Sequence, residues 1–407
     1  MPVITKSQVI RASNREKNTA FLLKLLNISV AHTQTLFLVS TYRNITSNMI
    51  NKDHSKEPDN ASSRLRERLY SSLKRHPKRI VFTEGEDVRV LEAAARLVEK
   101  EAIAPILLGD KARIKVLAVK NNIDTTFIHI LDPKTASDLP LFCKRLSNIV
   151  KYQGKVVANP EELISRPHNF AAMMVQYGQA DGIVAGNKSH PSTIVRAVTN
   201  FIKPLAHVPQ LFGTVAMTAP HIKNFGGDGL LLLADCGINP EPTVEELAAM
   251  AIENGKLAHH LLGRTARVGM LSHSTHGSMS TPSSLKMKAA TALAKDIVSK
   301  EYLDIEIDGE IQADVALDAA AAQIKLHDTR ADKPVDVLIF PNLDSAHIAY
   351  KILQHVAGTN CFGQLIMGIS RNAAQVPMTA DVDMIAGTAA LVACESIKYR
   401  ELYPDEH

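Results

Sequence analysis

The stretch KRIVFTEGEDVRVLEAAARLVEKEAIAPILLGD, residues 78–110, indicates the fold of this chain. Residues 78–82 form a short apolar run that leads into a turn with a glycine. Apolar residues then recur at helical spacing, and a second apolar run covers residues 103–108. These periods predict a strand, an amphipathic helix and a second strand. A helix that connects two strands in this way is typical of a βαβ unit, in which the two strands are parallel.

The same alternation continues toward the C-terminus. Thr243 followed by Glu246 three residues later predicts the capped start of one helix. Short apolar strands that alternate with helices favour a doubly wound α/β fold. The further predicted strands cover residues 180–186, 229–235, 267–272, 304–308, 335–341 and 363–369, and the predicted helices cover 244–262, 285–300, 313–326, 346–356 and 382–397.

Composition agrees with this fold class. At 407 residues the chain is longer than one ordinary domain, so we expect two domains. Hydrophobic residues make up 45% of the chain and Trp is absent, so Ala, Val, Ile and Leu must build the core. That mixture suits helices layered on a parallel sheet. Four widely spaced cysteines without a CxxC pair indicate a reducing compartment and no zinc site.

The positive charge of the chain is concentrated near its N-terminus. Residues 1–61 carry eight Lys and Arg against four Asp and Glu, whereas the remainder carries 38 of each sign. A neutral folded part predicts no nucleic-acid partner. The most apolar N-terminal run is interrupted by polar residues, so no membrane span is expected. We expect residues 1–61 to be a disordered extension or a targeting segment, because residues 1–48 have the composition of an organelle transit peptide. A true start at Met49 is a further alternative.

Polar loops follow the apolar runs, and in α/β folds ligands bind beyond the carboxyl ends of the strands. We therefore expect the chemistry to lie in these loops, gathered at one crevice. No Walker, GxGxxG, GxSxG or HExxH sequence accompanies them, which argues against a nicotinamide or flavin enzyme of the usual type. The loops read TEGED, AGNKSHPSTIVR, ADCGINPEP, SHSTHGSMS, DGEIQAD, PNLDSA and the segment after LIMGI.

The loop SHSTHGSMS, residues 272–280, is dense in hydroxyl groups. Hydroxyls and free backbone N–H groups could hold an anion there, and Gly277 would let the backbone approach it. A helix that begins near residues 283–285 would add N-terminal donors. A solvated serine-rich connection is the alternative. His273 and His276 could transfer protons or could simply lie at the surface.

Two further loops carry charged candidates. Asp308, Glu310 and Asp314 surround a strand-to-helix turn, where acids could form a general base or a metal site, or could cap the helix. Arg196 lies one turn into a helix predicted to begin near Ser192. A guanidinium there suits a phosphate or a carbonyl oxygen that gains charge, and a solvated salt bridge is the alternative.

Taken together, these loops resemble the phosphate acetyltransferase (phosphotransacetylase) family. The resemblance covers residues 64–400 and rests on six segments in the same order. It implies reversible acetyl transfer between acetyl-CoA and inorganic phosphate, giving acetyl phosphate and CoA. Coenzyme A would be a substrate, with no other cofactor and no metal. The segments are IVFTEGEDVRVLEAA, ADGIVAGNKSHPSTIVRA, LLLADCGINPEPTVEELAAMA, LSHSTHGS, DGEIQADVAL and PNLDSAHIAYKILQHVAG.

The resemblance also implies an architecture and partners. It implies two doubly wound α/β domains of the isocitrate/isopropylmalate-dehydrogenase-like type with a cleft between them. Residues 62–207 plus 366–407 would form domain 1, and residues 208–365 would form domain 2. It further implies a cytoplasmic homodimer with acetate kinase as pathway neighbour. The organelle matrix replaces the cytoplasm if residues 1–48 are a transit peptide.

Site residues are carried over position by position. Arg196 matches the arginine of the family's HxTxxxxRPAL-like segment and would bind phosphate or the acetyl carbonyl. The family's STKGSA loop matches residues 274–279, with His276 in place of its lysine, and its DGELQADAA turn matches Gln312 and Asp314. The resemblance thus implies Arg196 and Asp314 as catalytic residues. It implies substrate binding by Ser272, Ser274, Thr275, Gly277, Ser278 and Gln312.

The last loop departs from the family pattern. The family reads KPVNDLSRG followed by VEDI, with the Ser-Arg pair near CoA and the aspartate as proposed base. In the segment RNAAQVPMTADVDMI, Pro377 and Met378 stand at the Ser-Arg positions and Met384 stands at the aspartate position. We assign the base to the neighbouring Asp383, and contacts with CoA to Pro377, Met378 and Thr379.

Two kinds of function fit this sequence. The first is an active phosphate acetyltransferase with a rearranged CoA loop, or an acyltransferase for another short acyl chain. The second is a catalytically weak homologue that binds acyl-CoA as a regulatory module. The segments HPSTIVR and LADCGINPEP resemble the enzymes more closely and favour the first.

Overall fold

The computed structural model describes residues 61–152, 157–222, 225–326 and 334–402. These residues belong to one compact unit that spans residues 58–407. The interpretations of residues 1–48 lie outside the described residues.

The helices and strands alternate over most of the chain as the sequence predicts. The helices are α4 (Ala61–Arg75), α5 (Val88–Glu99), α6 (Lys111–Lys120), α7 (Leu139–Tyr152), α8 (Pro160–Ile164), α9 (Pro167–Gln176), α10 (Pro191–Phe201), α11 (Val244–Leu262), α12 (Pro282–Glu301), α13 (Ala313–Leu317), α14 (Ala319–Leu326), α15 (Leu343–Val356) and α16 (Val382–Leu402). The strands are β1 (Lys78–Phe82), β2 (Ile103–Leu108), β3 (His129–Leu131), β4 (Gly182–Ala185), β5 (Phe212–Thr218), β6 (Leu231–Ala234), β7 (Ala266–Leu271), β8 (Ile305–Ile311), β9 (Val337–Ile339), β10 (Asn360–Met367) and β11 (Asn372–Gln375). The alternation is broken twice, because β6 follows β5 and β11 follows β10 without a helix between them.

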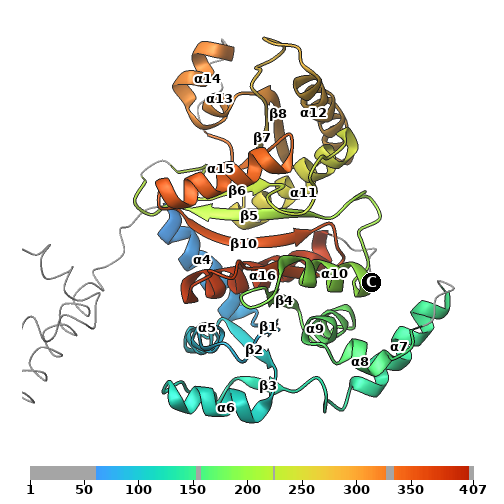
Figure 1. The fold of residues 1–407 in the computed structure, drawn as a ribbon. Helices are drawn as coiled ribbons and strands as arrows, with labels where there is room; N and C mark the ends of the chain where they lie inside the picture. Colours follow the sequence, from blue (N-terminus) through green and yellow to red (C-terminus); the bar gives the residue numbers. More distant parts are fainter. Residues whose placement is uncertain (1–60, 153–156, 223–224, 327–333, 403–407) are drawn as a thin grey trace, which may run out of the picture. The chain divides into compact units, whose positions relative to one another are not determined.

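Within the described residues the strands form a single sheet in the order β3-β2-β1-β4-β11-β10-β5-β6-β9-β7-β8, with helices on both faces (Figure 1). β1 and β2 pair in parallel, with Lys78 opposite Ile103, and α5 connects them, so the predicted βαβ unit is confirmed. The α/β fold class is confirmed as well. The division into two domains at residues 207 and 365 stays a prediction.

Strand direction reverses in the middle of this sheet. β10 is antiparallel to both β11 and β5, and β5 is antiparallel to β6. The parallel set β1, β2, β3, β4 and β11 therefore runs opposite to the parallel set β6, β7, β8 and β9. The carboxyl ends of β1, β4 and β11 form one edge of the sheet, and those of β6, β7 and β8 form another. The expectation that all the strand-end loops gather at one crevice stays a prediction.

Two predicted segments differ in their local structure. The predicted helix 313–326 is interrupted at Asp318, whose extended backbone (φ −123°, ψ 113°) separates α13 from α14. The predicted loop after residue 369 contains β11, which the sequence did not indicate because NAAQ has no β-branched or aromatic residue. β11 forms because each of its four residues pairs with a residue of β4.

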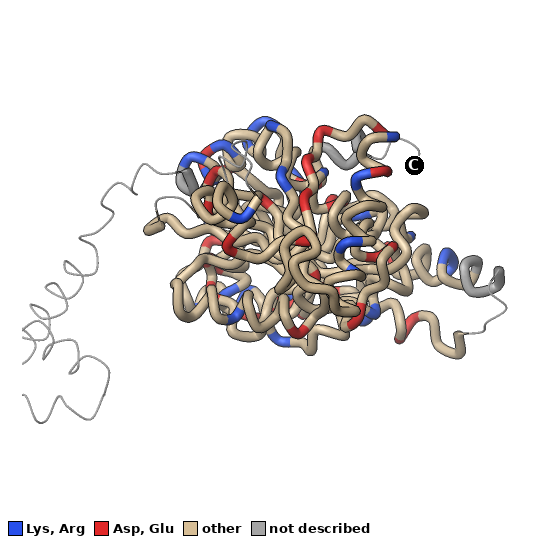
Figure 2. The backbone as a smooth tube through the Cα atoms, turned by 90° about the horizontal axis from the view of Figure 1, so that it is seen from above, with Lys and Arg blue, Asp and Glu red and all other residues tan. Residues whose placement is uncertain are grey.

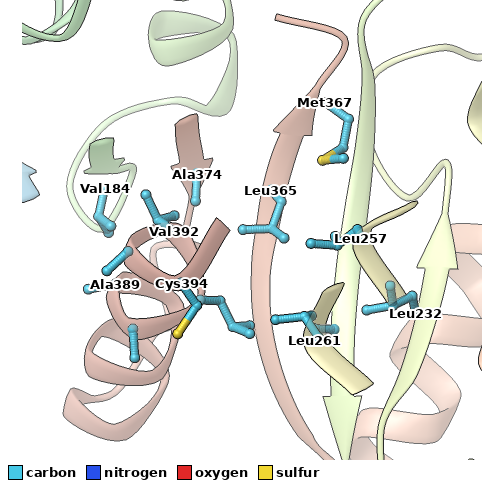
Figure 3. Close-up of a cluster of buried hydrophobic side chains, with 14 of the residues drawn as sticks. Val184, Leu232, Leu257, Leu261, Leu365, Met367, Ala374, Ala389, Val392 and Cys394 are labelled. Carbon is cyan, nitrogen blue, oxygen red and sulfur yellow. The ribbon is translucent and has the colours of Figure 1, made fainter. Parts of the chain in front are cut away.

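Small aliphatic side chains build the core, as the composition predicts. Ala389 and Val392 of α16 pack near Val184 of β4 and Ala374 of β11 (Figure 3). In the same view Leu257 and Leu261 of α11 lie near Leu232 of β6, and Leu365 of β10 lies between the two groups. The helices α11 and α16 thus bury one face of the central strands and fix where the strand-end loops begin.

Candidate functional site

The turn between β7 and α12 uses its own backbone donors. Ser272 N donates to the carbonyl oxygen of Ile311 (2.8 Å), and Gly277 N donates to Glu310 Oε1 (2.6 Å). The N–H groups of residues 274, 275, 276, 278 and 279 also have partners within the protein. The expectation of free backbone N–H groups is therefore wrong for these residues. Hydroxyl groups remain as the donors that this turn can offer to a ligand.

Glu310 is the buried centre of this turn. Its side chain is 1% exposed, and its Oε1 also accepts a hydrogen bond from Ser274 Oγ (3.0 Å). Among the described residues, Glu310 Oε2 has no hydrogen-bond partner. Burial raises the pKa of Glu310, but the N–H of Gly277 and the Ser274 hydroxyl lower it more, so this pKa lies below its ordinary value. A fixed negative charge therefore lies directly under the predicted anion loop.

Gln312 and Asp314 join the same turn from the end of β8. Gln312 N donates to Thr275 Oγ1 (3.1 Å). Lys325 Nζ of α14 donates to Gln312 Oε1 (2.8 Å) and to Asp314 Oδ2 (2.6 Å). The hydrogen bond from Lys325 lowers the pKa of Asp314. The sequence did not indicate Lys325 as a site residue, because only the tertiary fold brings α14 to this turn.

The two histidines of the turn differ in their contacts. His276 Nε2 lies 3.1 Å from Asp308 Oδ1, and Lys295 Nζ lies 3.4 Å from the same oxygen. His276 therefore has a carboxylate partner, whereas among the described residues the side chain of His273 has one hydrogen-bond partner, the Thr281 hydroxyl, at 3.5 Å. Asp308, Glu310 and Asp314 point to three different partners. Within the described residues no group of three or more His, Cys, Asp or Glu is placed to hold a metal ion.

A second polar cluster lies at the carboxyl ends of β1 and β4. Glu84 Oε2 accepts a hydrogen bond from Gly186 N (2.9 Å), and Glu84 Oε1 accepts one from Ser189 Oγ (2.5 Å). His168 Nε2 of α9 lies 2.9 Å from Ser189 Oγ and 3.4 Å from Glu84 Oε1. Burial raises the pKa of Glu84, but its hydrogen bonds with His168 and Ser189 bring it below the ordinary value. The side chains of Glu84 and His168 are 9% and 12% exposed.

Sequence reasoning missed this Glu84 cluster. It named both loops, TEGED and AGNKSH, but gave no signal for His168, which precedes β4 by 14 residues. The loop also contains Asn187, whose Nδ2 is buried with no hydrogen-bond partner among the described residues. A histidine that touches both a serine hydroxyl and a carboxylate can accept and return a proton.

The loop that carries Pro377, Met378 and Thr379 is tied to this second edge. Arg89 Nη1 donates to the carbonyl oxygens of Met378 (2.9 Å) and Ala380 (2.7 Å). The side chains of Met378 and Thr379 are exposed. The hydrogen bonds of this loop thus fix its backbone and leave two of the three predicted CoA contacts open to solvent.

Arg196 and Asp383 lie on the helices that follow β4 and β11, but their side chains have different surroundings. Arg196 lies on α10, is exposed, and forms no hydrogen bond or ion pair with any residue that the structure describes. Asp383 in the first turn of α16 forms an ion pair with Arg96 of α5. Asp381 caps α16 by accepting a hydrogen bond from Met384 N (2.8 Å). The predicted base is therefore an exposed, ion-paired carboxylate.

The predicted site residues thus fall into separate groups. Six strand spacings of about 4.8 Å, roughly 30 Å along the sheet, separate β4 from β7. No hydrogen bond or ion pair among the described residues links residues 272–278 to Arg196 or Asp383. Figure 2 shows Lys and Arg interspersed with Asp and Glu along the described backbone.

The sequence of the chain matches a known family over most of its length. The family description of phosphate acetyl/butaryl transferases matches residues 64–393. The chain belongs to this family. The predicted relationship to phosphate acetyltransferases is thereby confirmed, and the chain is an acyltransferase by family.

Individual relatives agree with this assignment. The phosphate acetyltransferase of Clostridium acetobutylicum is 32% identical over 75% of this chain and 91% of the relative. The phosphate acetyltransferase of Thermoanaerobacterium thermosaccharolyticum is 33% identical over 79% of this chain and 97% of the relative. The solved structure of the EutD phosphotransacetylase from Staphylococcus aureus has a TM-score of 0.74 at 30% identity and covers 82% of this chain and 99% of that chain.

Proposed function

We propose that this chain is a phosphate acetyltransferase, which transfers an acetyl group reversibly between coenzyme A and inorganic phosphate. The family match over residues 64–393 supports this proposal, because it spans both groups of strand-end loops. The main structural support for this proposal is that the side chain of Arg196 is exposed and has no partner among the described residues. An exposed guanidinium without a partner among the described residues, on the helix that follows β4, is available to an anionic substrate.

The reaction requires charge stabilisation and one proton transfer. A phosphate oxygen attacks the thioester carbonyl carbon, the carbonyl oxygen becomes an oxyanion, and the carbon–sulfur bond then breaks. Acetyl phosphate forms, and the thiolate of CoA leaves and takes up a proton. Arg196 binds phosphate or the oxyanion, where a charged donor is worth most in the transition state. In the reverse direction a base must accept the thiol proton.

Other residues take the supporting roles. Pro377, Met378 and Thr379 contact CoA at the edge that also carries Arg196. Asp383 handles the proton after its carboxylate leaves Arg96. At the carboxyl ends of β7 and β8, Asp314 stabilises charge together with Lys325. There a phosphate group is bound by the side chains of Ser272, Ser274, Thr275, Ser278 and Gln312, and Gly277 leaves room for it.

The substrates follow from the family. We assign acetyl-CoA and inorganic phosphate as substrates, with no other cofactor, and a homodimer as the assembly, with acetate kinase as pathway neighbour. Within the described residues no helix is long and apolar enough to cross a membrane. We assign the protein to the cytoplasm, or to an organelle matrix if residues 1–48 act as a transit peptide.

The decisive experiment measures turnover. Purified full-length protein is mixed with acetyl-CoA and phosphate, with arsenate as trap, and thiol release is followed. We expect release that saturates with both substrates, and Arg196→Ala should lower kcat by about 100-fold, as the loss of one oxyanion donor does. Asn200→Ala, an exposed position one turn further along α10, is the matched control and should keep full activity. Unchanged turnover in Arg196→Ala would refute the role of Arg196.

The ion pair between Asp383 and Arg96 favours a second function. A carboxylate paired with Arg96, next to a loop with Pro377 and Met378 at the expected Ser-Arg positions, is consistent with a regulatory domain that binds acyl-CoA without turnover. Saturable acetyl-CoA binding without thiol release would establish this second function. Repeating the assay with butyryl-CoA tests whether another short acyl chain is preferred.

A further inference from the structure

The turn formed by residues 274–280 cannot bind an anion as a cradle of backbone amides. The N–H groups of residues 274–279 all donate to acceptors within the protein. The buried carboxylate of Glu310 lies beneath them and would repel a second negative charge. An anion can bind here only if a side-chain cation compensates for Glu310.

Most cations around this turn already have partners. His276 and Lys295 both contact Asp308, and Lys325 contacts Asp314. Lys286 donates to the carbonyl oxygen of Pro341 (2.9 Å). Each of these charges already faces a carboxylate, since Lys286 Nζ also lies 3.6 Å from Glu241 Oε2.

Lys288 is different from these neighbours. Its side chain is exposed and forms no hydrogen bond or ion pair with the residues that the structure describes, but its charge helps to lower the pKa of Glu310. Helical side chains lean toward the N-terminus of their helix, so Lys288, about two turns into α12, reaches back over the turn that precedes the helix. A β-carbon added to Gly277 would lie 3.9 Å from Lys288 Nζ. The ammonium group therefore lies against the Gly277 backbone.

The hydroxyl of Ser280 completes the arrangement. Ser280 is exposed and forms no hydrogen bond with the described residues, unlike Ser274 and Ser278, whose hydroxyls lie 3.4 Å apart. Lys288 Nζ lies near Gly277, Ser280 follows three residues later in the same turn, and Glu310 holds the N–H of Gly277.

We propose that Lys288, with the Ser280 hydroxyl, binds a phosphate group at this turn. This site supplies the positive charge that His276 does not, because His276 is paired with Asp308. The proposal deepens the substrate-binding role that the proposed function gives to this turn. The phosphate group belongs to inorganic phosphate or to coenzyme A, and the experiment separates the two sources.

The first measurement is independent of turnover. The thermal unfolding midpoint of the full chain is measured in sodium phosphate and in sodium chloride of equal ionic strength. A ligand that binds the folded state raises the midpoint. We expect a phosphate-specific rise for the wild type and for Lys288→Arg. In Lys288→Ala the phosphate concentration needed for the same rise should increase roughly ten-fold or more, the loss of one hydrogen bond to a charged group.

Two control variants accompany Lys288→Ala. Lys300→Ala removes a lysine of the same helix that is paired with Asp296, and it should behave as the wild type. Arg196→Ala tests the other group of predicted site residues. A phosphate-specific rise that disappears in Arg196→Ala and persists in Lys288→Ala would overturn the proposal. An equal rise in phosphate and in chloride would overturn it as well.

Kinetics on the same preparations identify the source of the phosphate group. A raised KM for phosphate in Lys288→Ala assigns the site to inorganic phosphate, and a raised KM for acetyl-CoA assigns it to the coenzyme. If the wild type shows no thiol release, the proposed function fails, but the unfolding measurement still decides the role of Lys288. The two failures are therefore distinguishable.

Discussion

The two edges of the sheet hold similar clusters. At each edge a carboxylate near the end of one strand accepts a backbone N–H from a glycine and a hydroxyl from a serine, both on the loop of the neighbouring strand. Glu84 uses Gly186 and Ser189 in this way. At the other edge Glu310 uses Gly277 and Ser274. The shared arrangement joins two adjacent loops through one buried negative charge.

The clusters differ in how completely the carboxylate is satisfied. Both oxygens of Glu84 accept hydrogen bonds, and His168 lies beside them. Glu310 uses only Oε1, and its Oε2 has no partner among the described residues. A buried acceptor without a partner costs free energy. The difference indicates that the Glu84 cluster mainly holds two loops together, whereas the Glu310 cluster keeps part of its bonding capacity unused.

Alanine at the two glycines should give the largest contrast. Gly186 has φ +112°, and a β-carbon there would lie 2.4 Å from the carbonyl oxygen of Val376. Gly277 has φ +84°, but the atom nearest to such a β-carbon is Lys288 Nζ at 3.9 Å. We expect Gly186→Ala to lower the free energy of unfolding by ~3 kcal/mol or more and Gly277→Ala by about 1 kcal/mol, measured by urea unfolding. Equal losses would show that strain at the glycine, not steric contact, governs both positions.

Glutamine at the two carboxylates should give a smaller contrast. In Glu84→Gln an amide NH₂ must face a donor, either Gly186 N or the Ser189 hydroxyl, because both oxygens accept hydrogen bonds. In Glu310→Gln the NH₂ can take the place of Oε2, which has no partner among the described residues. We expect losses of about 2 kcal/mol for Glu84→Gln and less than about 1 kcal/mol for Glu310→Gln. A greater loss for Glu310→Gln would contradict the comparison.

The pH dependence of stability should give the smallest effect. The pKa of Glu84 is below 4.5 in the folded protein, so the unfolded state binds more protons between the folded pKa and 4.5. The stabilisation by Glu84 is therefore present above pH 4.5 and is lost as the pH falls through the folded pKa. The same sign holds for Glu310, whose pKa is also lowered. Urea unfolding from pH 6 to pH 3 should show a weaker decline for Glu84→Gln than for the wild type, and a parallel decline would exclude this contribution.

Local sequence determined many of the helices and strands of this protein, but not β3, β5 or β11. Thr243 and Glu246 form the predicted capping box, and α11 covers the predicted residues 244–262, because a helix cap depends only on residues three positions apart. The β1–α5–β2 unit followed from the period of its apolar residues for the same reason. The hydroxyl-rich turn at the end of β7 and the family of the chain could also be predicted, because both are written in short contiguous segments.

Tertiary structure alone decided which strand-end loops share an edge. The direction of β10 and β5 relative to their neighbours cannot be read from alternating strands and helices, yet it decides how the loops after β4 and β7 are placed relative to each other. Contacts across long separations decided the chemistry in the same way. Glu84 meets Gly186 102 residues away, and His168 meets Glu84 across 84 residues. A strand period records which side of the sheet a residue faces, but not which strand lies beside it, so these partners exist only once the sheet has formed.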